Sequence, residues 1–128
     1  MRRLRGRAIC RGKARGLALV SSEPIGFLGG VDPDTGTVIE QGHPLQGQSI
    51  AAKVLVFPTG KGSTVGSYTL YRLARQGMAP AALVNARSEA IVAVGAIIAG
   101  IPMVDSVDIA GIKTDEPVTV DGEEVIIG

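Results

Sequence analysis

Residues 53–76 read KVLVFPTGKGSTVGSYTLYRLARQ, and this stretch decides the fold. Lys53–Phe57 is a short apolar run, which predicts a strand buried on both faces. A glycine-rich segment, Thr59–Gly66, follows it. Ser67–Gln76 then carries apolar residues at helical spacing, and Gly77 is suited to end the helix. The stretch therefore predicts a strand, a loop and a helix, the first part of a parallel crossover.

A second strand–helix unit follows the first. Ala81–Asn85 is another apolar strand, and a helix follows it, with Ser88 as its cap and Glu89 as its first-turn acid, that runs to about Ala99. That helix is apolar on nearly every side, ends at Gly100, and leads into a short strand over Pro102–Asp105. Strand, helix, strand, helix and strand in this order predict a parallel sheet with right-handed crossovers.

The flanking segments are rich in strand patterns. Arg7–Val20 predicts one strand with a bend or bulge at Gly12 and Gly16, and Thr37–Glu40 predicts a short strand between two loops. Residues 118–127 predict a hairpin, with Asp121 and Gly122 as its two-residue turn. We expect these strands to form a second layer on the parallel one. The predicted fold class is α/β, with a β/β/α arrangement in one domain, residues 1–128.

Length and composition agree with one globular domain. The chain has 128 residues, of which 45% are hydrophobic and 20% charged. Its longest uncharged run, Ala90–Val104, is shorter than the roughly 20 residues that a membrane span needs. No signal peptide follows the basic start, so we expect a cytoplasmic protein without a membrane partner. With Cys10 and His43 as its only cysteine and histidine, the chain is not expected to bind a metal by itself.

Charge is unevenly distributed along the chain. Seven of the 13 basic residues lie between Arg2 and Arg15, while the remainder has 6 basic and 12 acidic residues, a net −6. Such an arm fits a nucleic-acid surface, an acidic partner chain, or a solvated first strand. Nucleic acid is the weakest of these, because none of the four aromatic residues lies among the arginines. We expect Arg2, Arg3 and Arg5 to be dispensable for chemistry.

The glycine-rich segment is the most informative candidate site. It follows the carboxyl end of a parallel strand, where ligands usually bind, and it precedes a helix whose first N–H groups lack partners. Gly60 and Gly62 allow the backbone to approach an anion, and Lys61 supplies a cation. The hydroxyl donors of this segment are Ser63, Thr64 and Ser67. The segment predicts a site for an anionic small-molecule substrate.

The segment matches neither standard phosphate-binding motif. In a P-loop the lysine directly precedes Ser or Thr, whereas Lys61 precedes Gly62. The spacing of Gly60, Gly62 and Gly66 is one residue too long for a dinucleotide fingerprint. A purely structural interpretation stays open, in which the glycines only permit tight packing of strand on helix.

Other residues are weaker candidates. His43 follows a glycine in a loop and is expected to be a surface histidine rather than a base. Cys10 lies in a strand pattern and is expected to be a small buried apolar residue. Asp105 and Asp108 follow a strand and are either carboxylates near the same sheet edge or turn residues. These residues do not make a catalytic triad.

Four segments of the sequence resemble the small subunit of aconitase X, and they occur in the family's order along almost the whole chain. These segments are Phe27–Pro33, Gly42–Leu45, Gly60–Ser67 and Val94–Pro102. The resemblance implies a swiveling β/β/α domain like the mobile domain of aconitase. It also implies a heterodimer whose large subunit carries an iron–sulfur cluster of the 4Fe–4S type.

Within that family the chain resembles the archaeal form. The resemblance then implies a hydro-lyase that converts (R)-5-phosphomevalonate to trans-anhydromevalonate 5-phosphate in the modified mevalonate route to isoprenoids. The family's proton-accepting serine corresponds to Ser63, and Lys61, Gly62 and Thr64 are implied substrate contacts. Two alternatives stay open: dehydration of cis-3-hydroxyproline by the same family, and a non-catalytic swivel-fold binding or scaffold domain.

Overall fold

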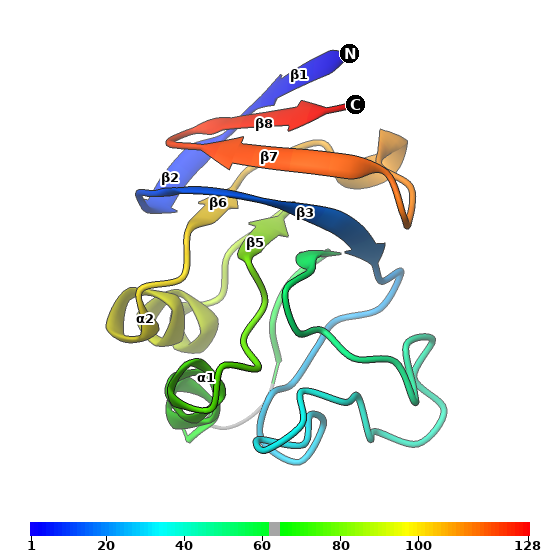
Figure 1. The fold of residues 1–128 in the computed structure, drawn as a ribbon, viewed down its shortest axis with the longest axis vertical. Helices are drawn as coiled ribbons and strands as arrows, with labels where there is room; N and C mark the ends of the chain where they lie inside the picture. Colours follow the sequence, from blue (N-terminus) through cyan, green and yellow to red (C-terminus); the bar gives the residue numbers. More distant parts are fainter. Residues whose placement is uncertain (62–64) are drawn as a thin grey trace.

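A single curled sheet organises the molecule. The structure, a computed structural model, describes residues 1–61 and 65–128. Within them, eight strands lie in the order β1-β8-β7-β3-β4-β5-β6-β2 (Figure 1). The strands are β1 Arg2–Arg5, β2 Arg7–Cys10, β3 Lys13–Val20, β4 Val54–Phe57, β5 Ala82–Asn85, β6 Met103–Asp105, β7 Pro117–Asp121 and β8 Glu124–Ile127. The helices are α1 Gly66–Arg75, α2 Ala90–Ala99 and the short 3-10 helix η1 Ile109–Gly111.

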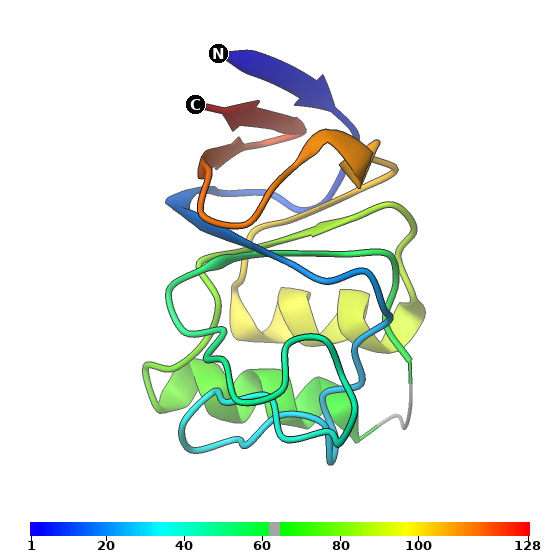
Figure 2. The same cartoon turned by 90° about the vertical axis from the view of Figure 1, so that its right-hand side faces the viewer.

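The centre of the sheet is parallel, as the strand–helix order predicts. β3 pairs with β4, β4 with β5 and β5 with β6, all in the parallel sense. Helix α1 connects β4 to β5, and α2 connects β5 to β6. Figure 2 shows both helices side by side beneath the sheet, covering one face. The carboxyl ends of the parallel strands and the starts of both helices therefore meet at one edge.

The two ends of the sheet come from the start of the chain. β1 pairs with β8 at one end, and β2 pairs with β6 at the other. Only Gly6 separates β1 from β2, so the sheet curls into a nearly closed barrel. The single strand predicted over Arg7–Val20 is wrong in this respect: the chain leaves β2 at one sheet end and re-enters as β3 in the middle. The bend predicted at Gly12 lies in that connection.

Alternate residues of the central strands fill two separate cores. Leu55 and Phe57 of β4 pack with α1 and α2 between sheet and helices, whereas Val54 and Val56 face the inside of the curl. This division explains why β4 is buried on both faces and lacks the polar alternation of a half-exposed strand. The inner core is completed by Val118, Val120 and Val125 from the hairpin, and by parts of β5 and β6.

The helix ends follow the local sequence. Glu89 rather than the predicted Ser88 caps α2, because its side chain accepts hydrogen bonds from the backbone N–H groups of Ile91 and Val92, and Gly100 ends the helix with φ 71°. Helix α1 begins one residue before the predicted start, and Gly77 follows it with φ 73°. The predicted strand over Thr37–Glu40 is only a pair of isolated bridges. No helix among the described residues is long and apolar enough to cross a membrane.

The hairpin forms where predicted, but its turn is shifted by one residue. Asp121 pairs with Glu124, so the two turn residues are Gly122 and Glu123 rather than Asp121 and Gly122. Gly122 has φ 63°, a conformation that glycine adopts without steric cost. The shift follows from the pairing of Val120 with Val125, because both side chains are buried in the inner core.

Candidate active site

The glycine-rich loop lies at the carboxyl end of β4, as predicted, and leads into α1. Its first half is an extension of the sheet: the Lys61 N–H donates to the Ile25 carbonyl at 3.0 Å, and the Ile25 N–H donates to the Thr59 carbonyl at 3.2 Å. Three predicted site residues, Gly62, Ser63 and Thr64, lie outside the described residues. The residues on either side of them fix where the loop leaves the sheet and where it joins α1.

Glycine at position 60 is required by packing. A Cβ on Gly60 would lie 2.3 Å from Cγ2 of Val92 and 3.2 Å from Oε1 of Glu89, both at the start of α2. The loop backbone therefore lies directly against the N-terminal turn of α2, which is where Glu89 caps the helix. The structural role that the sequence left open for these glycines is confirmed for Gly60, and it brings the loop close to both helix starts.

The cation of the loop already has a partner. The Lys61 ammonium lies 3.0 Å from Oε2 of Glu40, and the two side chains are 48% and 33% exposed. Glu40 belongs to the long connection between β3 and β4, so the sequence spacing gave no sign of this pair. An anionic ligand at the loop would meet a lysine whose charge is partly balanced by a carboxylate.

Ser67 does not offer a free hydroxyl. Its Oγ donates to the Ile91 carbonyl at 2.6 Å, and the residue is 7% exposed. This bond links the first turn of α1 to the first turn of α2. The expectation that Ser67 adds a ligand donor is therefore wrong: its hydroxyl joins the two helices.

The end of β5 supplies a cation that the sequence reading missed. The Arg87 N–H donates to the Pro58 carbonyl at 3.1 Å, which places this residue beside the loop. Arg87 is exposed, and its side chain has no hydrogen bond or ion pair with any described residue. Its position two residues after a parallel strand was the available signal. Nearby Asn85 is fully buried and donates to the Phe57 carbonyl at 3.0 Å.

Asp105 and Asp108 have structural roles. Asp105, 2% exposed, accepts two hydrogen bonds from Arg7 at 3.1 and 2.7 Å. The hydrogen bond from Arg7 is the main cause that lowers the pKa of the Asp105 carboxyl below its ordinary value. Asp108 accepts from the Ala110 N–H and starts the 3-10 helix. Of the two interpretations left open, the turn residue describes Asp108, whereas Asp105 is a carboxylate at the carboxyl end of the parallel strand β6, paired with Arg7.

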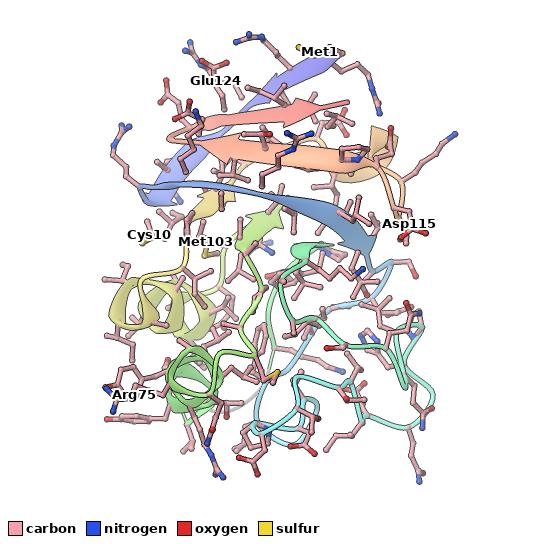
Figure 3. All side chains as sticks on the ribbon, in the orientation of Figure 1. Met1, Cys10, Arg75, Met103, Asp115 and Glu124 are labelled. Atoms are coloured by element: carbon pink, nitrogen blue, oxygen red, sulfur yellow. The ribbon has the colours of Figure 1, made fainter. Side chains whose placement is uncertain are left out.

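His43 and Cys10 differ from their predicted environments. His43 is 7% exposed rather than at the surface: one ring nitrogen lies 3.1 Å from the Pro24 carbonyl, and the other accepts from the Leu45 N–H. Both nitrogens are thus used to hold the loop. Cys10 is half-buried beside Met103 at the helix-side core (Figure 3). Among the described residues, no three metal-binding side chains gather.

The basic arm is strand β1, and the chain's own acids face it. Arg2 lies 2.9 Å from Glu116, Arg3 lies 3.1 Å from Glu124, and Arg5 lies 3.3 Å from Glu123. Figure 3 shows Glu124 among the charged side chains that project from this outer end of the sheet. With Arg7 and Asp105, four of the seven basic residues between Arg2 and Arg15 are therefore paired with acids of the chain, which favours the interpretation of a solvated strand with charged flanks.

The chain was then compared with known proteins. A family model described as the aconitase X swivel domain matches residues 3–128. The phosphomevalonate dehydratase small subunit of Methanocella arvoryzae is 58% identical over 97% of this chain and 96% of that protein. The protein of the same name from Methanothermobacter thermautotrophicus is 57% identical, over 92% of each chain. A crystal structure of Thermococcus kodakaraensis aconitase X in its holo-form has a TM-score of 0.98 and 52% identity, over 100% of this chain and 99% of that one.

Proposed function

The chain belongs to the aconitase X swivel-domain family, and on that premise we propose that it is the small subunit of a phosphomevalonate dehydratase. The single observation that carries the proposal is identity of 58% along nearly the full length of a relative with that name. The reaction removes a proton from C2 and the hydroxyl group from C3 of (R)-5-phosphomevalonate. Its products are trans-anhydromevalonate 5-phosphate and water.

We assign proton removal to Ser63, the serine of the loop at the carboxyl end of β4. A serine hydroxyl is a weak base, so its conjugate alkoxide needs stabilisation by positive charge. Two features of the described residues support such a field: the Lys61 ammonium in the same loop, and the start of α1 just beyond it. Gly62 and Thr64 are proposed to contact the substrate through their backbone and hydroxyl groups.

The phosphate and carboxylate of the substrate need cations or N–H donors. Lys61 is the proposed contact, and it exchanges part of its interaction with Glu40 for one with the substrate. The start of α1 next to the loop contributes N–H groups toward the same edge, whereas the Ile91 and Val92 N–H groups of α2 are already bonded to the Glu89 side chain. The small subunit would thus supply the base and part of the anion site, while a second chain supplies the rest.

The iron–sulfur cluster that the family implies is assigned to the large subunit. The residues described here do not fit such a group, because they include no cluster of three metal-binding side chains and Cys10 stands alone. We therefore expect the isolated chain to fold and to have no dehydratase activity. Activity needs the large subunit, and we place the assembled enzyme in the cytoplasm.

The test is co-expression of this chain with its own large subunit. The purified complex is assayed with phosphomevalonate and, in parallel, with cis-3-hydroxyproline, each followed by mass spectrometry of the product. We expect turnover of phosphomevalonate only. Preference for cis-3-hydroxyproline would overturn the proposed substrate, and activity of the small subunit alone would overturn the division of labour between the chains.

Ser63→Ala tests the assigned base. General-base groups contribute roughly 100- to 10,000-fold to rate, so we expect kcat to fall by about 1,000-fold in a complex that still assembles. Ser67→Ala is the matched control, because its hydroxyl is engaged with Ile91 and should affect stability rather than kcat. Equal kcat for Ser63→Ala and the unmodified complex would favour a scaffold domain instead.

A further inference from the structure

Helix α2 presents an apolar surface to solvent. Its sequence, AIVAVGAIIA, contains no polar side chain. Val92 and Ala96 face the core, yet three large residues on the opposite side remain exposed: Val94 by 51%, Ile97 by 55% and Ile98 by 46%. A helix on the surface of a monomeric protein normally carries polar residues on its outer side, whereas a helix that is apolar all round is buried.

Helix α1 extends the same surface. Tyr68 is 68% exposed and Tyr71 is 42% exposed. Between the two helices lies an open groove of about 420 Å³. The groove is lined by Ser67, Tyr68, Ala90, Ile91, Val94 and Ile98. We call this combined surface, made by Tyr68, Tyr71, Val94, Ile97 and Ile98, the helix face. Contiguous apolar surface of this kind typically marks an interaction site rather than chance exposure.

The partner that covers the helix face can be inferred from the position of this face beside the glycine-rich loop. Ser67, the groove residue nearest the start of α1, directly follows Gly66, the last residue of the glycine-rich loop. Ala90, on the other side of the groove, is the first residue of α2. In an enzyme whose reactive groups come from two chains, the contact between the chains has to border the shared site. The groove leads to that border, beside the described ends of the glycine-rich loop.

The other candidate surface is less suited to a permanent contact. The basic arm, β1, is already paired with Glu116, Glu123 and Glu124, so a partner would have to break these pairs or bury them. The five side chains of the helix face carry no charge, although Arg75 lies one turn along α1 from Tyr71 at its margin, and its tyrosines are among the residues enriched at interfaces. Apolar burial without a desolvation penalty favours the helix face over the arm.

We propose that the helix face docks the large subunit. This inference rests on the proposed function, because the relatives' designation as small subunits is what implies a larger partner. The complementary surface of that partner is apolar, with the Val94, Ile97 and Ile98 side chains at the centre of the contact and Tyr68 and Tyr71 at one side. The interaction would hold the glycine-rich loop at the junction of the two chains.

The experiment measures binding without substrate. Ile97→Lys and Val94→Lys are introduced separately into the full chain, and each variant is titrated against immobilised large subunit. A charge buried without a partner in an apolar contact costs several kcal/mol, so we expect Kd to rise about 100-fold or more. Thermal unfolding of each variant alone confirms that it folds, because lysine at an exposed helix position costs little. Ile97→Ala, a milder second variant, should raise Kd about tenfold.

Leu17→Lys is the matched control. Leu17 is a large apolar residue of β3, 44% exposed, and it does not line the groove between the helices, so its replacement should leave Kd unchanged. Unchanged Kd for Ile97→Lys and Val94→Lys would overturn the proposal, as would a second copy of this chain that occupies the helix face in the presence of the large subunit. Because the readout is binding, a complex that forms normally but does not dehydrate phosphomevalonate would overturn only the proposed function.

Discussion

Lys61 has two roles, one through its backbone N–H group and one through its side-chain ammonium. Its backbone N–H holds the loop to the segment at Ile25, and its ammonium lies 3.0 Å from Glu40. The ion pair lies at the surface and contributes little to stability. The pair instead determines where the Lys61 ammonium lies. It keeps the ammonium on the side of the loop where Glu40 lies until an anion competes for it.

Neutralising each member of this pair should have opposite effects on substrate binding. Lys61→Gln removes a charged donor and should raise KM for phosphomevalonate about tenfold, since a hydrogen bond to a charged group contributes about 1.5–3 kcal/mol. Glu40→Gln removes the competing carboxylate and should leave KM equal or lower. Steady-state kinetics on the assembled complex measure both, and a higher KM for Glu40→Gln would show that Glu40 positions the lysine instead.

Asp105 gives the fold a defined pH dependence. The Arg7 hydrogen bonds lower the pKa of its carboxyl, so the stabilisation is complete above the ordinary Asp value of about 3.9. It is lost as the pH falls through the lowered pKa of the folded chain. We expect Asp105→Asn to lower the free energy of unfolding by about 1–3 kcal/mol at neutral pH. The difference from the unmodified chain should shrink toward zero in strong acid.

Urea denaturation as a function of pH measures this effect. Glu124→Gln is the control: Glu124 also pairs with an arginine, but at an exposed position, so its replacement should change stability by less than about 0.5 kcal/mol at any pH. A constant difference between Asp105→Asn and the unmodified chain down to about pH 2 would contradict the assignment, since a titrating carboxyl has to lose its advantage once it is protonated.

Among elements, the contact between α1 and α2 depends on one glycine. A Cβ on Gly95 would lie 2.7 Å from Cδ1 of Leu70 and 3.1 Å from Cα of Ser67. The absence of a side chain lets the helices approach closely enough for the Ser67 hydroxyl to reach the Ile91 carbonyl. The close approach also determines the shape of the groove between them.

Gly95→Ala should therefore destabilise the chain although alanine is the better helix former. Overpacking costs about 1–3 kcal/mol, and the gain in helix propensity offsets about 1 kcal/mol of it. Gly66→Ala in α1 is the matched control, because its added Cβ would meet Cγ2 of Ile91 at an ordinary 3.5 Å. Thermal unfolding compares the two. A more stable Gly95→Ala variant would show that the helices are free to separate without cost.

Element boundaries were predictable where the signals are local. Glu89 and Gly100 act through hydrogen bonds and backbone conformation within one helical turn; the end at Gly100 is confirmed, and the start lies one residue later than predicted because Glu89 is the cap. The sequence of Arg7–Val20 contains no such local signal that its two halves pair with different strands of the sheet. Its division into two strands depends on which strands are neighbours in space, and the pattern of a single segment does not contain that information.

At the scale of the whole molecule, Gly6 allows the sheet to curl. It lies between β1 and β2, the two ends of the sheet, and its N–H donates to the Glu123 carbonyl at 2.9 Å. A Cβ there would lie 2.1 Å from the Asp105 carbonyl oxygen and 2.7 Å from Cγ2 of Val107. The first strand can pass from one end of the sheet to the other only because this position has no side chain.

Gly6→Ala is expected to lower the free energy of unfolding by about 3 kcal/mol or more, because backbone atoms at such distances have to move apart. Gly111→Ala is the control: the nearest atom to its added Cβ is the end of the flexible Arg2 side chain, at 3.0 Å. Urea denaturation of both variants gives the comparison. Equal stability of Gly6→Ala and the unmodified chain would contradict the tight closure between β1 and β2.

The sequence alone determined the parallel centre, both helices and the place of the glycine-rich loop, because these follow from periodicity, capping and spacing along short stretches, and its motifs carried the resemblance to the family. Ser63, Gly62 and Thr64 stay predictions of the sequence. Only the tertiary structure decided which charges meet: Lys61 with Glu40, Arg7 with Asp105, and the basic arm with acids from the end of the chain. These partners are far apart in sequence, and an ion pair depends on distance in space, which the closure of the sheet sets.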